Sequence, residues 1–153
     1  MTNPDSFREA EQFFHQRIPI TRAMGVQVVP DPRGFALEAP VALNYNHLQT
    51  AFGGSINAVA TLAAYGLLWL ELRQDPETHV VVRESSIRFL RPIRETIHAV
   101  CRRPAEAELE ALKLRLNERG KGRIELNVLV EEDDDAAAEF KGTFVALRSV
   151  SGK

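Results

Sequence analysis

The residues best suited to catalysis lie together just ahead of the most apolar part of the chain, in the segment NYNHLQTAFGGS at positions 44–55. Where a helix begins, the first backbone N–H groups lack partners, and the helix macrodipole adds a partial positive charge. Gly53 and Gly54 have no side chains to keep a carbonyl oxygen away from such groups, so the pair could hold the oxyanion of an acyl-transfer reaction. A tight turn that only packs the helix closely is the alternative.

Three polar residues interrupt the apolar segment that follows. Asn57, Thr61 and Tyr65 stand four residues apart and therefore share one helix face with the glycines. Burial of such groups is costly unless they form hydrogen bonds. They either line a cleft or bond to the surrounding structure, for example to the carbonyl four residues back.

Ser86 is a further candidate, in a predicted strand where it alternates with Val82, Glu84 and Arg88. It could face the same cleft or belong to an ordinary half-exposed strand face. A nucleophilic triad is not indicated, because no G-x-S-x-G elbow occurs and His47 has no evident serine partner. No HExxH motif or cysteine–histidine cluster occurs, so we expect neither a metal nor a bound cofactor.

Composition limits the class of protein. The 153 residues are 44% hydrophobic and 26% charged, which predicts one globular domain over residues 1–153. A formal charge of −2 favours neither nucleic acid nor anionic lipid as a partner. The single cysteine, Cys101, and a start without a signal core predict a cytoplasmic protein. The apolar-rich run Ala58–Leu70 is shorter than the ~20 residues that cross a bilayer, so we expect no membrane span.

Hydrophobic periodicity and turn residues divide the chain into helices and strands. The expected elements are a helix from Ser6, with Glu9 completing a capping box, that ends before Pro19; strands Gly25–Val29 and Phe35–Ala39; a helix Gly54–Leu72; strands His79–Leu90 and Thr96–Arg102; a helix Pro104–Arg119; and strands Arg123–Glu131 and Phe140–Leu147. The acidic run EEDDD is expected to be a solvated hairpin loop.

The helix Gly54–Leu72 is apolar on almost every side, so other structure must cover it. The longer strands are mostly antiparallel, which predicts an α+β fold with one curved sheet wrapped around this helix. A single sheet layer covers the helix incompletely. We therefore expect a second copy to cover the remainder as a homodimer.

This pattern resembles the hot-dog-fold thioesterases, in which a sheet wraps a long helix and two subunits pair. Asn46-HLQ-Thr50-Ala-Phe52-Gly53-Gly54 resembles the N-x-x-G-x-x-H-G-G loop of PaaI-type acyl-CoA thioesterases. It is more similar to the N-H-x-x-T-A-F-G-G-S form of the YiiD C-terminal thioesterase family. The segments IRFLRP at 87–92 and GKGRI at 120–124 also resemble hot-dog landmarks.

The resemblance implies hydrolysis of acyl-CoA or acyl-carrier thioesters at an interface between subunits, either in a dimer or in a dimer of dimers. Gly53 and Gly54 would bind the thioester carbonyl, and Asn46 would orient a water or the substrate. Phe52 stands where the PaaI motif has histidine, and Thr61 where that family has a helix carboxylate. The expected general base is thus missing, and our hypothesis is that Asn46 and Thr61 hold the water. Further substrate-binding candidates are Phe52, Asn57, Ser86 and Arg91.

Arginines give the central strands and the bend between them a basic character despite the neutral total charge. Under the resemblance they could bind the CoA phosphates, with Arg91 first, because arginine binds phosphate in fork geometry. Solvated strand edges are the alternative. The residues concerned are Arg88, Arg91, Arg94, Arg102 and Arg103.

Two other functions compete with the thioesterase. A hot-dog dehydratase or hydratase needs a histidine and a carboxylate on the helix, and residues 55–70 contain no acid. A non-catalytic acyl-ligand sensor or dimeric interaction module needs only the pocket, so it remains open.

Overall fold

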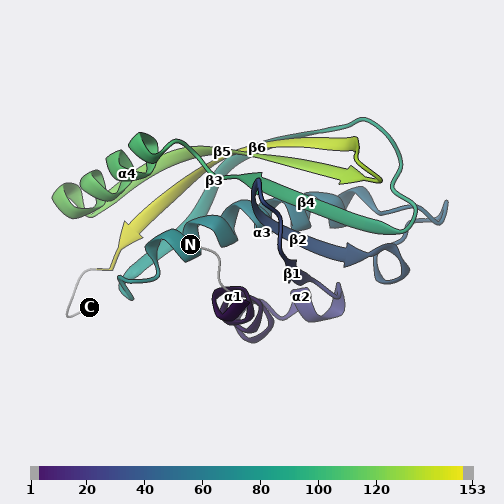
Figure 1. Ribbon diagram of the computed structural model, residues 1–153, viewed down its shortest axis with the longest axis horizontal. Coiled ribbons are helices and arrows are strands. Elements are labelled where there is room, and N and C mark those ends of the chain that lie inside the picture. The colour runs from purple at the N-terminus through teal and green to yellow at the C-terminus, as the bar shows by residue number, and fades with distance from the viewer. Residues whose placement is uncertain (1–3, 150–153) are drawn as a thin grey trace.

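A curved antiparallel sheet wraps around one long helix (Figure 1). The computed structural model describes residues 4–149. The helices are α1 (Pro4–Arg17), α2 (Ile20–Ala23), the 3-10 turn η1 (Val41–Leu43), α3 (Gly53–Leu72) and α4 (Glu106–Arg119). The strands are β1 (Gln27–Val29), β2 (Gly34–Pro40), β3 (Thr78–Phe89), β4 (Thr96–Arg102), β5 (Lys121–Glu132) and β6 (Asp135–Arg148). Their order in the sheet is β1-β2-β4-β5-β6-β3, and every neighbouring pair is antiparallel.

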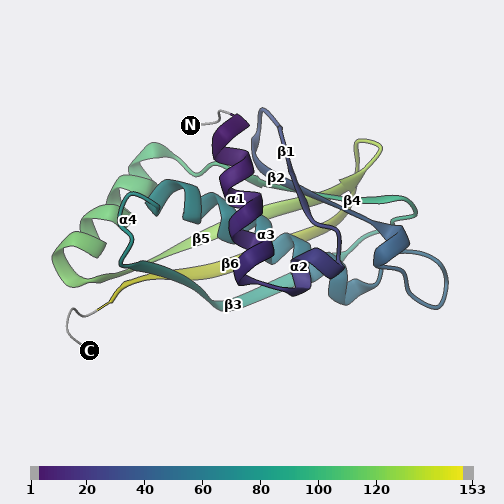
Figure 2. The ribbon, with the colours of Figure 1, turned by 90° about the horizontal axis from the view of Figure 1, so that it is seen from below.

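Helix α3 is the centre of the core. It contacts strands β2 to β6, and its apolar residues are buried beneath the sheet. Helix α1 crosses α3 on the side away from the sheet (Figure 2), where Phe13 stacks on Tyr65 and Trp69. One stripe of α3 stays only half-buried. It consists of Gly53, Asn57, Thr61, Tyr65 and Trp69.

The expected α+β arrangement is confirmed, and most elements lie within a few residues of their predicted bounds. Helix α3 was located by its long apolar run, and β4 by the alternation at its start. Helix α4 ends as predicted at Gly120, whose φ of +70° is the left-handed conformation that favours glycine at a helix end.

The predicted capping box at Ser6 is wrong. Helix α1 begins earlier, at Pro4, so Ser6 and Glu9 lie inside it. Both side chains bind Arg73 instead: its guanidinium donates to the Ser6 hydroxyl at 3.0 Å and forms an ion pair with Glu9. A long-range contact thus explains this spacing, which sequence alone assigned to a local cap.

The acidic run is also more ordered than expected. Only Asp133 and Asp134 form the turn, with φ values of +52° and +65°, as in a two-residue hairpin of type I′. Glu131 and Glu132 continue β5, and neither is simply solvated. Glu131 is buried, and the Glu132 carboxylate accepts the backbone N–H groups of residues 94–96.

Helix α3 has 20 residues and is, within residues 4–149, the one helix whose length and composition would suit a membrane span. More than half of its most apolar stretch, 56%, is buried inside the protein. The core position of α3 accounts for its apolar character without a bilayer.

Gly66 lets the rings of the core approach α3. A Cβ at this position would lie 2.1 Å from Phe35 Cε1 and 2.9 Å from Phe14 Cζ, and both rings are buried. Alanine normally stabilises a helix relative to glycine. We expect Gly66→Ala instead to lower the free energy of unfolding by about 1–3 kcal/mol through overpacking. Urea unfolding of Gly66→Ala, alone and combined with Phe35→Leu, measures this. An equal cost in both backgrounds would contradict the clash.

Candidate active site at the start of α3

The loop before α3 is held firmly by its own backbone and by the neighbouring strands. Phe52 N–H donates to Asn44 O at 2.7 Å, and Ala51 N–H donates to Ile93 O at 2.8 Å. The buried Asn44 amide donates to the carbonyls of Met24 and Pro40. These bonds fix the point at which α3 begins.

Three backbone amides at that point have no hydrogen-bond partner in the described residues 4–149. Phe52 is extended and supplies no side-chain cap, while its carbonyl accepts the N–H of Ile56 at 3.0 Å. Within residues 4–149, the N–H groups of Gly53, Gly54 and Ser55 donate no hydrogen bond. Gly54 is exposed and Gly53 half-buried, so this first turn of α3 lies at the protein surface. The helix start therefore has the geometry of an anion or oxyanion site.

Two aromatic rings frame these amides. Phe52, 55% exposed, lies over Gly54, where a Cβ would come within 2.3 Å of its ring. Phe89, at the end of β3, lies 3.5 Å from the Cβ position of Gly53. Neither glycine has a positive φ, so close approach explains their presence and backbone strain does not. No sequence pattern had indicated that Phe89 lies beside the glycine pair.

The polar residues near the amides differ in how far they are engaged. The Asn46 amide donates to Thr50 Oγ1 at 3.1 Å, and its oxygen accepts the N–H of Leu48 at 2.9 Å, so this side chain closes its own loop. Thr61 Oγ1 donates to Asn57 O at 2.8 Å, the back-bonding that the sequence left as an alternative. In contrast, the buried Asn57 Oδ1 has no hydrogen-bond partner among residues 4–149. On the same stripe, burial raises the pKa of the Tyr65 hydroxyl.

Ser86 does not share the α3 side of the sheet. A β-bulge lies between Val82, which is opposite the core residue Phe144, and Glu84. The bulge reverses the alternation, so Ser86 lies opposite Lys141 on the outer face. Ser85, opposite Gly142, takes the inner position instead. A period of two counted through an unrecognised bulge accounts for the different prediction.

The arginines at the bend are largely engaged by acids. Arg91, the first choice for phosphate binding, forms an ion pair with Asp135 at 2.8 Å. Arg88 lies 3.9 Å from Glu139, and Arg103 pairs with Glu71 and Glu106. Apart from Glu106, three residues after Arg103, these partners are distant in sequence, so spacing alone did not reveal them.

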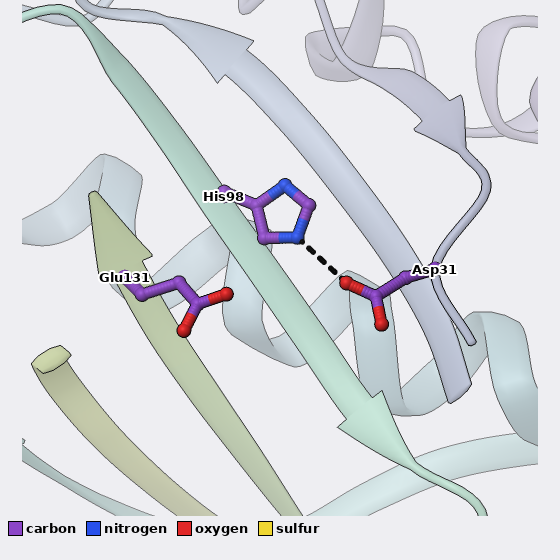
Figure 3. Close-up of side chains that lie close together, drawn as sticks. All are labelled: Asp31, His98 and Glu131. Carbon is purple, nitrogen blue, oxygen red and sulfur yellow. Dashed lines mark hydrogen bonds and ion pairs between the residues drawn. The ribbon is translucent and has the colours of Figure 1, made fainter. Parts of the chain in front are cut away.

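Several charged side chains also lie close together on the outer face of the sheet (Figure 3). His98 on β4 has Nε2 3.1 Å from Asp31 Oδ2 and Nδ1 2.8 Å from Glu38 Oε2. The Arg33 guanidinium donates to both Asp31 and Glu131. Hydrogen bonds from Arg33 hold the pKa of Asp31 far below its usual value and also lower the pKa of Glu131.

Asp31, His98 and Glu131 could in principle offer three ligand atoms to a metal, all within 4.8 Å of one another. The Arg33 guanidinium already bridges the two carboxylates and supplies the positive charge that a cation would bring. The cluster is thus an ion-pair network between the β1–β2 turn and the sheet, and we assign it a structural role.

Comparison with known proteins identifies the family and the fold. A family model described as "Putative thioesterase (yiiD_Cterm)" matches residues 7–148. The chain belongs to this family. The hot-dog fold expected from the sequence is confirmed as well: a "putative thioesterase" from Shewanella oneidensis has 26% sequence identity and a TM-score of 0.83, over 95% of this chain and 99% of that one.

Two further solved structures are similar to this member of the YiiD C-terminal thioesterase family. A protein of unknown function from Chlorobaculum tepidum has 29% identity and a TM-score of 0.87, covering 95% of this chain and 97% of its own. A "probable thioesterase" from Pseudomonas aeruginosa, at 24% identity and a TM-score of 0.80, covers 97% and 99% and supports the fold alone.

The Arg33 network should make stability depend on acid pH. Because the folded-state pKa values of Asp31 and Glu131 are lowered, their contribution is present above their unfolded values of 3.8 and 4.5 and is lost as pH falls through the folded values. We expect Arg33→Met to cost on the order of 2 kcal/mol at pH 7, with the difference from the parent shrinking toward pH 3. Urea unfolding as a function of pH measures this.

Lys141→Met is the matched control, because Lys141 pairs with Glu125 at 4.0 Å with both side chains more than half exposed. It should change stability by less than about 0.5 kcal/mol. A cost for Arg33→Met that is the same at pH 7 and pH 3 would contradict the assignment.

Proposed function

We propose that this protein hydrolyses acyl-CoA thioesters, with the thioester oxygen bound by the backbone N–H groups of Gly53 and Gly54. Membership of the thioesterase family supports the class of reaction. One observation carries the site: these amides have no acceptor in residues 4–149 and lie at the open, positive end of the core helix.

The chemistry follows from that placement. Attack of water on the thioester carbonyl moves negative charge onto the oxygen, where fixed N–H donors stabilise it. Each donor of this kind is typically worth ~2.7–4 kcal/mol in the transition state. Collapse of the intermediate breaks the carbon–sulfur bond, a proton passes to the sulfur, and a carboxylic acid and a thiol leave.

Asn57 and Thr61 are the side chains best placed to hold the water. A helical side chain points toward the N-terminus of its helix, so Asn57 lies over the turn that contains Gly53. Its Oδ1 is buried and forms no hydrogen bond within residues 4–149, so it has acceptor capacity for a water that reaches it. The Thr61 oxygen can still accept a hydrogen bond after donating to Asn57 O. Asn46 then serves to shape the loop.

We also propose a homodimer formed through β3. This strand is an edge of the sheet, and its exposed apolar side chains include Val81, Val82 and Phe89. Pairing with a second β3 would satisfy the free edge and cover the half-buried stripe of α3. The amides at Gly53, beside Phe89, would then lie in a crevice between subunits.

A non-catalytic acyl-ligand-binding protein is the second candidate. It is favoured by the absence of any acid from residues 55–70 and by the back-bonded Thr61 hydroxyl, which leave the site without a general base. Tight binding of acyl-CoA without release of free thiol would support this function over hydrolysis.

Gly53→Pro tests the oxyanion donors directly. Gly53 is the first residue of α3, where proline is well tolerated, and Phe52 before it already has the extended conformation that proline requires. The variant lacks one N–H group and should lose about 10²–10³-fold in kcat. Thiol release from an acyl-CoA panel measures this.

Gly53→Ala is the control, since its Cβ would only make ordinary contact with Phe89 at 3.5 Å and the N–H remains. It should retain most of the activity. Equal rates for the proline and alanine variants would exclude the Gly53 amide from the reaction.

Val82→Lys tests the dimer. Val82 is 44% exposed on the β3 edge, and a lysine there would bring like charges together across a two-fold axis. Sedimentation equilibrium should show a monomer with an unchanged circular dichroism spectrum. Leu114→Lys, at a 56% exposed position on α4, should stay dimeric. If both variants kept the assembly of the parent, the interface would have to lie elsewhere.

A further inference from the structure

A concave surface at the far end of the sheet from Gly53 carries a high density of positive charge. We name it the cationic cup. Its cations are Arg83 on β3, Arg115 and Arg119 on α4, and Lys121 and Arg123 on β5, around a cavity of about 870 Å³. Helix α4 flanks the part of β5 that lacks a β4 partner, which brings its arginines to the outer face.

None of these five cations has a carboxylate within ion-pair distance in residues 4–149, and no acidic residue lines the cup. Most other arginines differ in this respect. Those with an acidic partner are Arg8, Arg33, Arg73, Arg88, Arg91, Arg103 and Arg148. Positive charges on one concave surface repel one another, and a bound anion would offset this repulsion. The cup therefore favours an anionic ligand.

The floor of the cup is apolar. Val81 and Val145 lie opposite each other on β3 and β6, and Leu147 follows on the same face. A ligand that fits must combine several negative charges with a flat or apolar group. An arginine guanidinium can donate two parallel hydrogen bonds to phosphate oxygens, and aliphatic side chains can pack against the face of a nucleobase.

We propose that the cationic cup binds the phosphorylated adenosine end of CoA. This inference rests on the proposed function, because a CoA thioester is the substrate that carries such a group. It also moves phosphate binding away from the bend at Arg91, whose guanidinium is held by Asp135.

The position of the cup suits a site shared by two subunits. Helix α4 and the start of α3 lie at opposite ends of the molecule (Figure 2). Val81 and Phe89 of β3 lie opposite Val145 and Ala138 of β6, which are seven residues apart, or ~23 Å at 3.3 Å per residue. If two β3 strands pair antiparallel about their midpoints, the Thr78 end of one lies beside the Phe89 end of the other. The cup of one subunit then lies at the same end as the glycine pair of its partner.

Titration calorimetry with CoA tests the cup without requiring turnover. We expect Arg115→Glu/Arg119→Glu and Arg123→Glu to weaken CoA binding at least tenfold. Arg22→Glu on α2 is the matched control, since Arg22 is exposed and also has no ion-pair partner within residues 4–149, and it should bind CoA like the parent. Binding of 3′-dephospho-CoA and pantetheine should be weaker than that of CoA in the parent protein and less affected by the cup variants.

The outcomes separate this inference from the proposed function. Unchanged CoA binding in the cup variants, or inorganic phosphate binding as tightly as CoA, would overturn the cup even if acyl-CoA is hydrolysed. CoA binding that depends on the cup supports it even if no thiol is released, and in that case hydrolysis fails on its own. A rise in KM for acyl-CoA, with no change for acyl-pantetheine, is the expected kinetic result in the same variants.

Discussion

The burial of α3 is the constraint on which the rest of the structure depends. A helix this apolar must be covered, and a single curved sheet covers all but one stripe of it. The helix must also begin somewhere, and its first N–H groups cannot bond within the helix. Here they emerge at the end of that stripe farthest from α1, which covers Tyr65 and Trp69. Burial of the apolar surface thus leaves these donors at the protein surface.

Charge is distributed unevenly over the outer face of the sheet. At one end, Arg33 joins the acids of the β1–β2 turn and β5 into a network that holds the turn against the sheet. At the other end, the cations around Val81 have no acidic partner within the described part of the chain. The net charge of −2 does not reveal that the acidic and basic groups lie at opposite ends of this face. Total charge therefore says little about a local anion site.

Sequence predicted the parts of the structure that rest on local periodicity or on local turn chemistry. The strand Thr96–Arg102, the end of α4 at Gly120 and the apolar helix were all recognised from neighbouring residues. Spacing also placed Asn57 and Thr61 on the stripe that begins at Gly53. What the sequence did not reveal depends on residues far apart in the chain. Arg73 engages Ser6, Asp135 engages Arg91, and both contacts exist only after folding.

The bulge at Arg83 affects how related chains should be compared. Without that residue, Val82 and Glu84 would be neighbours and would still face opposite sides of the sheet, as they do now. A relative whose strand is regular therefore requires a one-residue gap opposite Arg83. If the gap is placed further along the strand, Ser86 takes the column that belongs to Ser85, and an outward-facing hydroxyl is credited with a position beside the helix.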